Sequence, residues 1–324
     1  MALSGLVLVT GGAGFIGSHI VDALIERGAR VRVVDNLSTG HLENLNHVSG
    51  KIDFLEGDLA NEKIARRAVD GVELIFHEAA LPSVPRSVAK PRETHLASVE
   101  ATFSLLLTAR EARVRRIIYA ASSSAYGDQR TLPKVETMRP EPVSPYAVAK
   151  LVGEYYCQVF TRTYGLETIC LRYFNVFGPR QDPGSPYSGV ISRFVDHLLR
   201  GECPTIYGDG EQTRDFNYVA NAVEANMLAA ESSKGIGEII NIANGKAVNI
   251  NELFQLTAAI IGRDDIEPVY QPARTGDVRH SLGDISRARE SLGFVPRIQL
   301  REGLELTVAA SRAMTVAQPS TSPT

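Results

Sequence analysis

The sequence predicts an α/β protein with a doubly wound parallel sheet and a second, smaller mixed α/β domain. Three observations lead to this prediction. Short apolar runs alternate with amphipathic segments in the first half, a glycine-rich turn follows the first run, and loops and helices predominate after residue 179. Strand–helix alternation of this kind is typical of parallel strands in one sheet with helices on both faces.

Six apolar runs are expected to be strands. They are LVLVT (6–10), RVRVV (30–34), IDFLEG (52–57), ELIFH (73–77), RIIYAAS (116–122) and ETICLRYF (167–174). The amphipathic segments at 15–28 and 95–112 are expected to be helices between them. The later runs PTIYG and EIINIAN are shorter, which indicates brief strands in a different setting.

These patterns suggest a division of the chain. Residues 1–178 form the expected nucleotide-binding domain, and segments around 214–244 return to it. Residues 179–213 and 245–313 form the expected substrate domain. The small polar residues at 314–324 are expected to be a disordered tail.

Composition excludes several functional classes. The chain has 324 residues, of which 44% are apolar and 22% charged, as in a soluble globular protein. Its net charge of -3 gives no reason to expect nucleic acid, and no apolar run reaches membrane-spanning length. Cys157, Cys170 and Cys203 form no CxxC pair, so neither a disulfide framework nor a metal site is expected. No signal peptide is expected either, and a cytoplasmic location fits.

The turn TGGAGFIGS is the first candidate site. Gly12, Gly14 and Gly17 fit G-x-G-x-x-G between an expected strand and an expected helix, with Gly11 as an additional glycine. This is the context of a Rossmann dinucleotide site, where backbone N–H groups approach a pyrophosphate. Asp35 ends the next strand, where its carboxylate can bind the ribose hydroxyls and repel a 2′-phosphate. We therefore expect NAD rather than NADP.

Other cofactor contacts are expected along the same sheet edge. Asp58 follows the third strand, although it could equally be a turn or capping residue. The segment 76–81 (FHEAAL) ends the fourth strand at the carboxyl edge, where ligands bind in such folds. The full expected set is Gly11, Gly14, Phe15, Ile16, Gly17, Asp35, Asn36, Thr39, Gly40, Asp58, Leu59, Ala79, Ala80, Tyr146 and Lys150.

The stretch SPYAVAK places Tyr146 and Lys150 four positions apart, on one face of an expected helix. Alone, the pair could be a partly buried tyrosine beside a solvated lysine. Beside a nicotinamide, and with Ser122 at the end of the fifth strand, the three would form a catalytic proton relay. An ammonium about 4 Å away favours a phenolate by roughly 4 kcal/mol at an effective dielectric near 20. The phenol could then act as a general base.

Taken together, several motifs resemble the extended short-chain dehydrogenases/reductases, and among them the nucleotide-sugar epimerases. They are TGGAGFIGS, SSSAYGD, YAVAK, LRYFNVFGPRQ, IYGDGEQTRDFNYV and RTGDVRHSLGD, which span nearly the whole chain. The resemblance is closest to UDP-sugar 4-epimerases that accept N-acetylated hexosamines. It implies an isomerase with tightly bound NAD and no metal, which oxidises C4 of a UDP-hexose and re-reduces the transient 4-keto sugar. It also implies a homodimer.

The resemblance also implies roles for individual residues. Tyr146 would be the base, Lys150 would tune it and hold the nicotinamide ribose, and Ser122 would bind the sugar 4-hydroxyl. Arginine forks would clamp the UDP diphosphate. Ser281 stands where epimerases restricted to non-acetylated sugars carry tyrosine, which implies room for an N-acetyl group. The expected substrate-binding set is Ser83, Ser122, Ser123, Tyr146, Asn175, Gln181, Arg214, Arg274, Asp277 and Ser281.

Some positions depart from the family pattern or bear on alternatives. Ser98 replaces an asparagine that often approaches the cofactor, and Pro82 stands where relatives often have glycine. Related 4,6-dehydratases carry an Asp-Glu pair within the segment 122–124, and UDP-glucuronate decarboxylases carry a Glu at 124. Serine at all three positions argues against both. A non-catalytic NAD sensor would typically lack the Tyr or Lys. UDP-glucose/galactose, UDP-GlcNAc/GalNAc and UDP-glucuronate/galacturonate all stay open as substrates.

Overall fold

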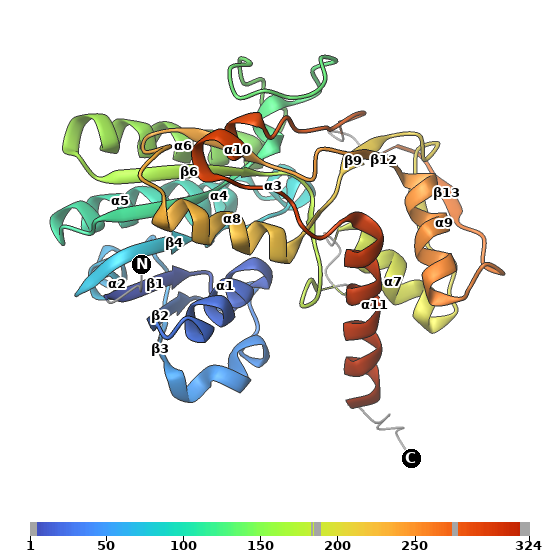
Figure 1. The fold of residues 1–324 in the computed structure, drawn as a ribbon, viewed down its shortest axis with the longest axis horizontal. Coiled ribbons are helices and arrows are strands. Elements are labelled where there is room, and N and C mark those ends of the chain that lie inside the picture. Colours follow the sequence, from blue (N-terminus) through green and yellow to red (C-terminus); the bar gives the residue numbers. More distant parts are fainter. Residues whose placement is uncertain (1–4, 183, 185–188, 274–277, 318–324) are drawn as a thin grey trace.

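The computed structural model describes residues 5–182, 184, 189–273 and 278–317 (Figure 1). A seven-stranded sheet crosses the larger part of the molecule, and every pair of neighbouring strands in it is parallel. Its strand order is β11-β6-β5-β4-β1-β2-β3. The strands are β1 (Leu6–Thr10), β2 (Arg30–Asp35), β3 (Ile52–Glu56), β4 (Val72–His77), β5 (Arg116–Ser122), β6 (Glu167–Tyr173) and β11 (Ile239–Ile242).

The strand order reverses between β1 and β4. From β1 the chain first proceeds to β2 and β3 on one side and then returns to β4 on the other. In open parallel sheets, ligands bind beyond the carboxyl ends of the strands at such a reversal. The doubly wound sheet predicted from the sequence is confirmed, and it places the glycine turn after β1 at this point.

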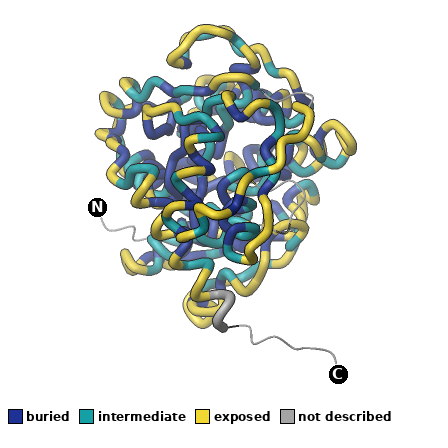
Figure 2. The backbone as a smooth tube through the Cα atoms, turned by 90° about the vertical axis from the view of Figure 1, so that its right-hand side faces the viewer, coloured by how far each residue is buried: buried dark blue, intermediate teal, exposed yellow. Residues whose placement is uncertain are grey.

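Helices cover both faces of the sheet, because successive side chains on each strand point to opposite faces. One apolar core joins the sheet to α1 (Phe15–Glu26), α8 (Val219–Glu231) and α10 (Ser286–Leu292). The other joins it to α2 (Glu62–Val69), α5 (Ala101–Glu111) and α6 (Pro145–Tyr164). Figure 2 shows buried parts of the chain, in dark blue, running through the interior.

A smaller layer lies beside the sheet, on the right in Figure 1. Its separate apolar core is formed mainly by α7 (Val190–Arg200), α9 (Ile250–Ile261) and α11 (Leu300–Ala317). Three two-stranded pairs accompany it: β7 (Val176–Phe177) with β10 (Asn217–Tyr218), β8 (Thr205–Tyr207) with β13 (Val269–Gln271), and β9 (Thr213–Asp215) with β12 (Ala247–Asn249).

Two segments differ from the expected division. Residues 286–294, expected in the substrate domain, pack Ala288, Leu292 and Phe294 into the core that covers β11 and α8. These three apolar side chains are buried because α10 returns to the sheet. The helix α11 continues to Ala317, so the first residues of the expected disordered tail are helical. No helix in the described ranges is long and apolar enough to cross a membrane.

Short helices shape the carboxyl edge of the sheet. They are η1 (Leu42–Lys51), α3 (Val84–Ala89), α4 (Pro91–His95), the π-helical turn η2 (Leu96–Glu100) and η3 (Ser123–Tyr126). The segment expected as one helix at 95–112 is therefore interrupted, since the π-helical turn precedes α5. Such turns are frequent next to functional sites.

Candidate functional site

The larger cavity, of about 690 Å³, opens at the reversal between β1 and β4. Most residues expected to bind the cofactor line it together, although they come from four separate loops. They are Gly11, Gly14, Phe15, Ile16, Gly17, Asp35, Asn36, Thr39, Asp58, Leu59, Ala79 and Ala80. Of the remaining expected residues, Gly40 packs against Asp35, Tyr146 lines a neighbouring cavity, and Lys150 is buried.

The glycine turn leaves no space for side chains. A Cβ on Gly11 would lie 2.8 Å from the Ala79 backbone, and the φ of +66° at Gly11 is unfavourable for other residues. A Cβ on Gly17 would lie 2.2 Å from the carbonyl oxygen of Gly11. The turn can therefore fold against the start of α1 only with glycine at these positions. The N-terminus of α1 consequently faces the cavity at close range.

Asp35 lines the larger cavity at the end of β2. Its carboxylate accepts hydrogen bonds from the backbone N–H groups of Ala13 at 3.0 Å and Leu37 at 2.8 Å. Burial raises the pKa of the Asp35 carboxyl, and these hydrogen bonds oppose the rise. A Cβ on Gly40 would lie 2.9 Å from Asp35 Oδ2, so the small residue permits the close packing of this loop.

Asp58 has the structural role that was left open. Its Oδ1 accepts a hydrogen bond from the Ala60 N–H at 2.9 Å, and its Oδ2 accepts one from Asn36 Nδ2 at 3.2 Å. Asp58 thus organises the loop after β3 and, with Asn36, also lines the cavity. A turn-forming role and a cofactor-binding role are both available to it.

The position of Ser98 explains how the cavity is closed without the family asparagine. Ser98 is 1% exposed, and its hydroxyl is buried without a hydrogen-bond partner. The cavity is lined instead by Ala97 and Ala101 from the same segment. The helix therefore contributes apolar surface to the cavity wall.

A second cavity, of about 380 Å³, adjoins the first. Ile16 and Pro82 line both. The expected catalytic and substrate residues that line the second cavity are Ser122, Ser123, Tyr146, Asn175, Arg214 and Ser281. Ser83 and Gln181 line the first. Arg274 and Asp277 lie outside the described residues.

Tyr146 and Lys150 are placed by α6, which begins with a clear start signal. The Ser144 hydroxyl accepts a hydrogen bond from the Ala147 N–H at 3.2 Å, and Pro145 occupies the first turn. Lys150 is 4% exposed, and its Nζ donates a hydrogen bond to the Ala120 carbonyl oxygen at 2.6 Å. The ammonium also lies 5.2 Å from the centre of the Tyr119 ring. Lys150 is therefore anchored on β5.

Ser122 connects β5 to the relay. Its Oγ accepts hydrogen bonds from the Ser124 N–H at 3.2 Å and the Ser124 hydroxyl at 2.9 Å. The Ser122 hydroxyl also forms a hydrogen bond with Tyr146. The structure thus brings Ser122 and Tyr146 together in the second cavity, while Lys150, on the same helix as Tyr146, is bound to the β5 backbone.

The charges of the relay differ from the expectation in one respect. Burial raises the pKa of Tyr146, the hydrogen bond with Ser122 lowers it, and the Glu78 carboxylate raises it further. Burial lowers the pKa of Lys150 to about 8, against the opposing effect of Glu78 and Glu154. The expected lowering of the phenol pKa by Lys150 is not found in this structure: burial is the largest influence on the pKa of Tyr146, and the hydrogen bond with Ser122 is what opposes it.

The outer end of the second cavity carries polar and basic groups. Arg214, 8% exposed, donates hydrogen bonds from Nη1 to the Thr213 carbonyl oxygen at 2.9 Å and to that of Arg279 at 3.4 Å. The Ser281 N–H donates to the Thr213 carbonyl oxygen at 3.1 Å, which holds Ser281 next to β9. Serine at this position keeps a small side chain in the cavity wall.

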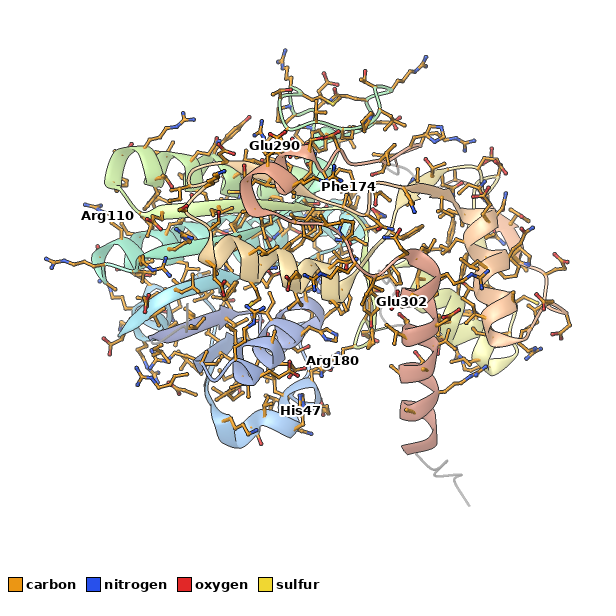
Figure 3. All side chains as sticks on the ribbon, in the orientation of Figure 1. His47, Arg110, Phe174, Arg180, Glu290 and Glu302 are labelled. Atoms are coloured by element: carbon orange, nitrogen blue, oxygen red, sulfur yellow. The ribbon has the colours of Figure 1, made fainter. Side chains whose placement is uncertain are left out.

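Among the cavity-lining residues that the sequence analysis did not predict are two charged ones, Arg180 and Glu78. Arg180 has a φ of 67°, and its Nη2 lies 2.7 Å from Asp22 Oδ2 of α1, while its buried Nη1 has no hydrogen-bond partner among the described residues (Figure 3). Glu78 follows β4 directly and also lines the larger cavity. In the sequence, the charged residue inside each of the motifs GPRQ and FHEAAL could have indicated that Arg180 and Glu78 line the cavity.

These features fit a dinucleotide. The glycine turn offers backbone N–H groups at a helix N-terminus, Asp35 faces the same cavity, and the buried Arg180 Nη1 is a donor without a partner in the described part of the chain. Together the fold and the site define an NAD-dependent enzyme of the extended short-chain dehydrogenase/reductase class. Residues 7–243 match the profile of the NAD dependent epimerase/dehydratase family. The chain belongs to this family.

Three solved structures are similar to the chain over nearly its whole length. A UDP-glucose 4-epimerase from Thermotoga maritima, solved with UDP-glucose, is 44% identical with a TM-score of 0.91 and covers 96% of this chain and 99% of that one. A UDP-N-acetylglucosamine 4-epimerase from Methanobrevibacter ruminantium, in complex with UDP-N-acetylmuramic acid, is 41% identical with the same TM-score and the same coverage. A UDP-glucose 4-epimerase from Thermus thermophilus in complex with NAD is 36% identical with a TM-score of 0.87, covering 95% and 99%.

Proposed function

We propose that this protein interconverts the C4 epimers of UDP-hexoses and keeps NAD in the larger cavity throughout the cycle. One observation carries the proposal: Tyr146, hydrogen-bonded to Ser122, lines the cavity that adjoins the NAD-fitting cavity. The relatives named above include 4-epimerases of UDP-glucose and of UDP-N-acetylglucosamine. In this proposal, the seven-stranded sheet and its helices bind the cofactor, and the smaller layer contributes to binding of the UDP moiety.

The bound NAD supplies a reversible hydride acceptor at C4. Tyr146 takes the proton of the 4-hydroxyl and later returns a proton to the same oxygen. Ser122 would bind that oxygen, because its hydroxyl lies beside the Tyr146 phenol in the same cavity. Lys150 keeps a positive charge close to the developing phenolate, and β5 fixes its position. For inversion, the 4-keto sugar must turn over between the two hydride transfers.

The serine segment favours this chemistry over elimination or decarboxylation. Ser122, Ser123 and Ser124 all line the second cavity, and none of them supplies a carboxyl group as acid or base. The two transfers at C4 need only the proton relay and a polar group for the oxygen. A 4-epimerase therefore requires nothing that this site lacks.

For the sugar, we propose that UDP-GlcNAc and UDP-GalNAc are substrates. The support is the small side chain of Ser281 in the wall of the second cavity. A tyrosine at this position would fill space that a serine leaves open. Ser123 lines the same cavity, and Ser83 and Gln181 line the adjoining one. Ser83 is already engaged, because its hydroxyl accepts a hydrogen bond from the Arg86 N–H at 3.0 Å. Ser123 and Ser281 are therefore the stronger candidates for the acetamido group.

The direct experiment is incubation of the purified protein with each UDP-sugar, without added NAD, followed by separation of the epimers. Tyr146→Phe with retained NAD should lose at least about 100-fold in turnover, as expected for loss of a general base. Turnover within a few-fold of wild type in that variant would remove Tyr146 as the base.

The sugar preference is tested with Ser281→Tyr. The added ring should lower kcat/KM for acetylated sugars and spare UDP-glucose and UDP-galactose, because the exclusion is steric. If the wild-type protein converts UDP-glucose but not UDP-GlcNAc, the substrate assignment reverts to UDP-glucose or UDP-glucuronate.

We further propose a homodimer formed through α6 and the segment before α5. Val148, Tyr155 and Val159 share one face of α6 and are 47%, 50% and 49% exposed, and Leu96 of η2 is also exposed. Burial of these side chains against a second copy would remove this apolar patch from water. The dimer should appear in light scattering of wild-type protein and be weakened by Tyr155→Glu.

Cys157 and Cys170 are free thiols, which supports a reducing compartment such as the cytoplasm.

A further inference from the structure

Glu78 is the end of a hydrogen-bonded chain that starts on α8. Asn226 of α8 donates a hydrogen bond from Nδ2 to Tyr173 Oη at 2.6 Å. The phenol of Tyr173, at the end of β6, donates to Glu78 Oε1 at 2.8 Å. The chain therefore delivers a hydrogen bond from α8 and β6 to a carboxyl group at the carboxyl end of β4.

The direction of this chain is fixed. Asn226 Nδ2 also donates to the Ala222 carbonyl oxygen at 2.9 Å, so the amide must present its nitrogen on this side. Tyr173 then accepts from Asn226, and its own proton is directed to Glu78. Because Tyr173 donates this hydrogen bond, it stabilises the ionised carboxylate of Glu78, which can only accept.

The charged and titratable groups around Glu78 belong to the relay. Burial raises the pKa of Glu78 to about 7, while the Tyr173 hydrogen bond and Lys150 lower it. Glu78 and Glu154 both favour the charged form of Lys150, and Glu78 also raises the pKa of Tyr146. The adjacent His77 is neutral, because burial lowers its pKa to about 3. Glu78 is thus the carboxylate that acts on both relay residues from the cofactor cavity.

We propose that Glu78 is a positioning residue of the reaction: its carboxylate, held by Tyr173 in the wall of the cofactor cavity, favours the cationic oxidised state of the cofactor over the neutral reduced state. The inference rests on the proposed function for its kinetic part only. A buried negative charge lowers the energy of a nearby cation, and a neutral dihydronicotinamide gains nothing from it. The same charge opposes formation of a phenolate at Tyr146.

The test compares wild type with Glu78→Gln, which retains an acceptor for Tyr173 and removes the charge. The matched control is Glu73→Gln on the same strand, whose carboxylate is partly exposed and pairs with Arg115 at 3.2 Å. Holoprotein is equilibrated with a mixture of NAD and NADH, and the bound ratio is quantified after rapid desalting. We expect the bound NADH:NAD ratio to rise about tenfold in Glu78→Gln and to be unchanged in the control.

The pH profile of kcat supplies the second readout. Because Glu78 raises the pKa of Tyr146, its removal should move the acid limb to lower pH by about one pH unit, a tenfold gain in rate on that limb. Tyr173→Phe should shift the limb in the same direction by less, since an unsupported Glu78 is protonated more readily. This variant also serves if Glu78→Gln fails to fold.

The outcomes separate the two proposals. A lower melting temperature with an unchanged NADH:NAD ratio and an unchanged acid limb would show a structural role only and would overturn the inference. If no UDP-sugar is turned over by the wild-type protein, the proposed function fails, and the bound-cofactor ratio still decides the inference on Glu78.

Discussion

A single added methyl group on α6 tests how tightly the relay is held. Gly153 faces Tyr119 of β5, and a Cβ at this position would lie 2.1 Å from the phenol Oη and 2.4 Å from Cζ. Tyr119 is 1% exposed, and its Oη donates a hydrogen bond to the Lys150 carbonyl oxygen at 3.3 Å. The ring cannot turn aside easily, because the Lys150 ammonium lies on one side and His77 packs 5.6 Å away.

The size of the effect follows from these distances. Ordinary contacts begin at 3.4 Å, so Gly153→Ala requires α6 and Tyr119 to separate by about 1.3 Å. Tyr146 and Lys150 lie on the same helix within two turns of Gly153, and they would move with it. A displacement of about 1 Å in a catalytic group can reduce a rate by roughly 100-fold. Overpacking should destabilise the fold by about 1–3 kcal/mol.

Helix propensity alone predicts that Gly153→Ala would stabilise the protein, so the sign of the change in stability distinguishes the two effects. Alanine is more favourable than glycine inside a helix by about 1 kcal/mol. We therefore expect a net loss of up to about 2 kcal/mol of unfolding free energy, or a fall in melting temperature of up to roughly 3 °C for a chain of this size. The measurements are calorimetry and kcat with saturating UDP-sugar. Gly50→Ala is the control, because a Cβ there meets nothing within 4 Å. A Gly153→Ala protein that melts above wild type with full activity would refute the reasoning.

Two further predictions concern the cofactor and the core. Asp35→Asn keeps the size of the side chain and removes its charge, so the preference for NAD over NADP should fall by about tenfold or more in cofactor exchange monitored by mass spectrometry; undiminished discrimination would show that the charge of Asp35 does not face the ribose. Glu154→Gln leaves Arg172 without its buried carboxylate partner at 2.6 Å. The expected loss is about 3–5 kcal/mol of unfolding free energy in urea titration, and a loss below about 1 kcal/mol would contradict it.

Local patterns predicted the fold and many of the residues that line the larger cavity. The boundaries of β1 and β5 agree with the sequence-based strands at both ends, because apolar runs bounded by turns specify strands locally. Gly11, Gly17 and Asp35 were predictable for the same reason, since the turn and the strand end are contiguous in sequence.

The features that the sequence did not predict depend on contacts between distant segments. Glu78 shifts the pKa values of Tyr146 and Lys150 although it is distant from both in sequence, and its partner Tyr173 comes from 95 residues further along the chain. The return of α10 to the sheet depends on an apolar surface that exists only once β11 and α8 have docked. Tertiary packing decides both outcomes, and no local motif encodes them.

A buried histidine at the end of β4 provides a stability measurement that is independent of the reaction. Thr102 donates a hydrogen bond from its hydroxyl to the Ser98 carbonyl oxygen at 2.6 Å, so it must accept from His77 Nε2 at 2.9 Å. His77 Nδ1 then accepts from the Thr10 hydroxyl at 2.7 Å, and Thr10 Oγ1 accepts from the Ala79 N–H at 3.2 Å. The ring is therefore a neutral link between the ends of β1 and β4 and the helix beyond them.

Neutrality of His77 makes the stability of the protein fall as the pH is lowered. Burial, assisted by the charge of Lys150, lowers the pKa of His77 from 6.5 to about 3 in the folded state. Below pH 6.5 the unfolded state takes up a proton that the folded state does not. The free energy of unfolding should therefore decrease by about 1.4 kcal/mol per pH unit from this group, a contribution present above pH 6.5 and lost progressively towards pH 3. His77→Gln removes this slope, so the difference between wild type and variant in urea titrations should shrink by about 2 kcal/mol between pH 6.5 and 5. All carboxyl groups are common to both proteins, and Lys150 stays charged over this range. A difference that is constant with pH would mean that His77 takes up its proton equally in both states, and the assigned direction of the hydrogen-bonded chain would be wrong.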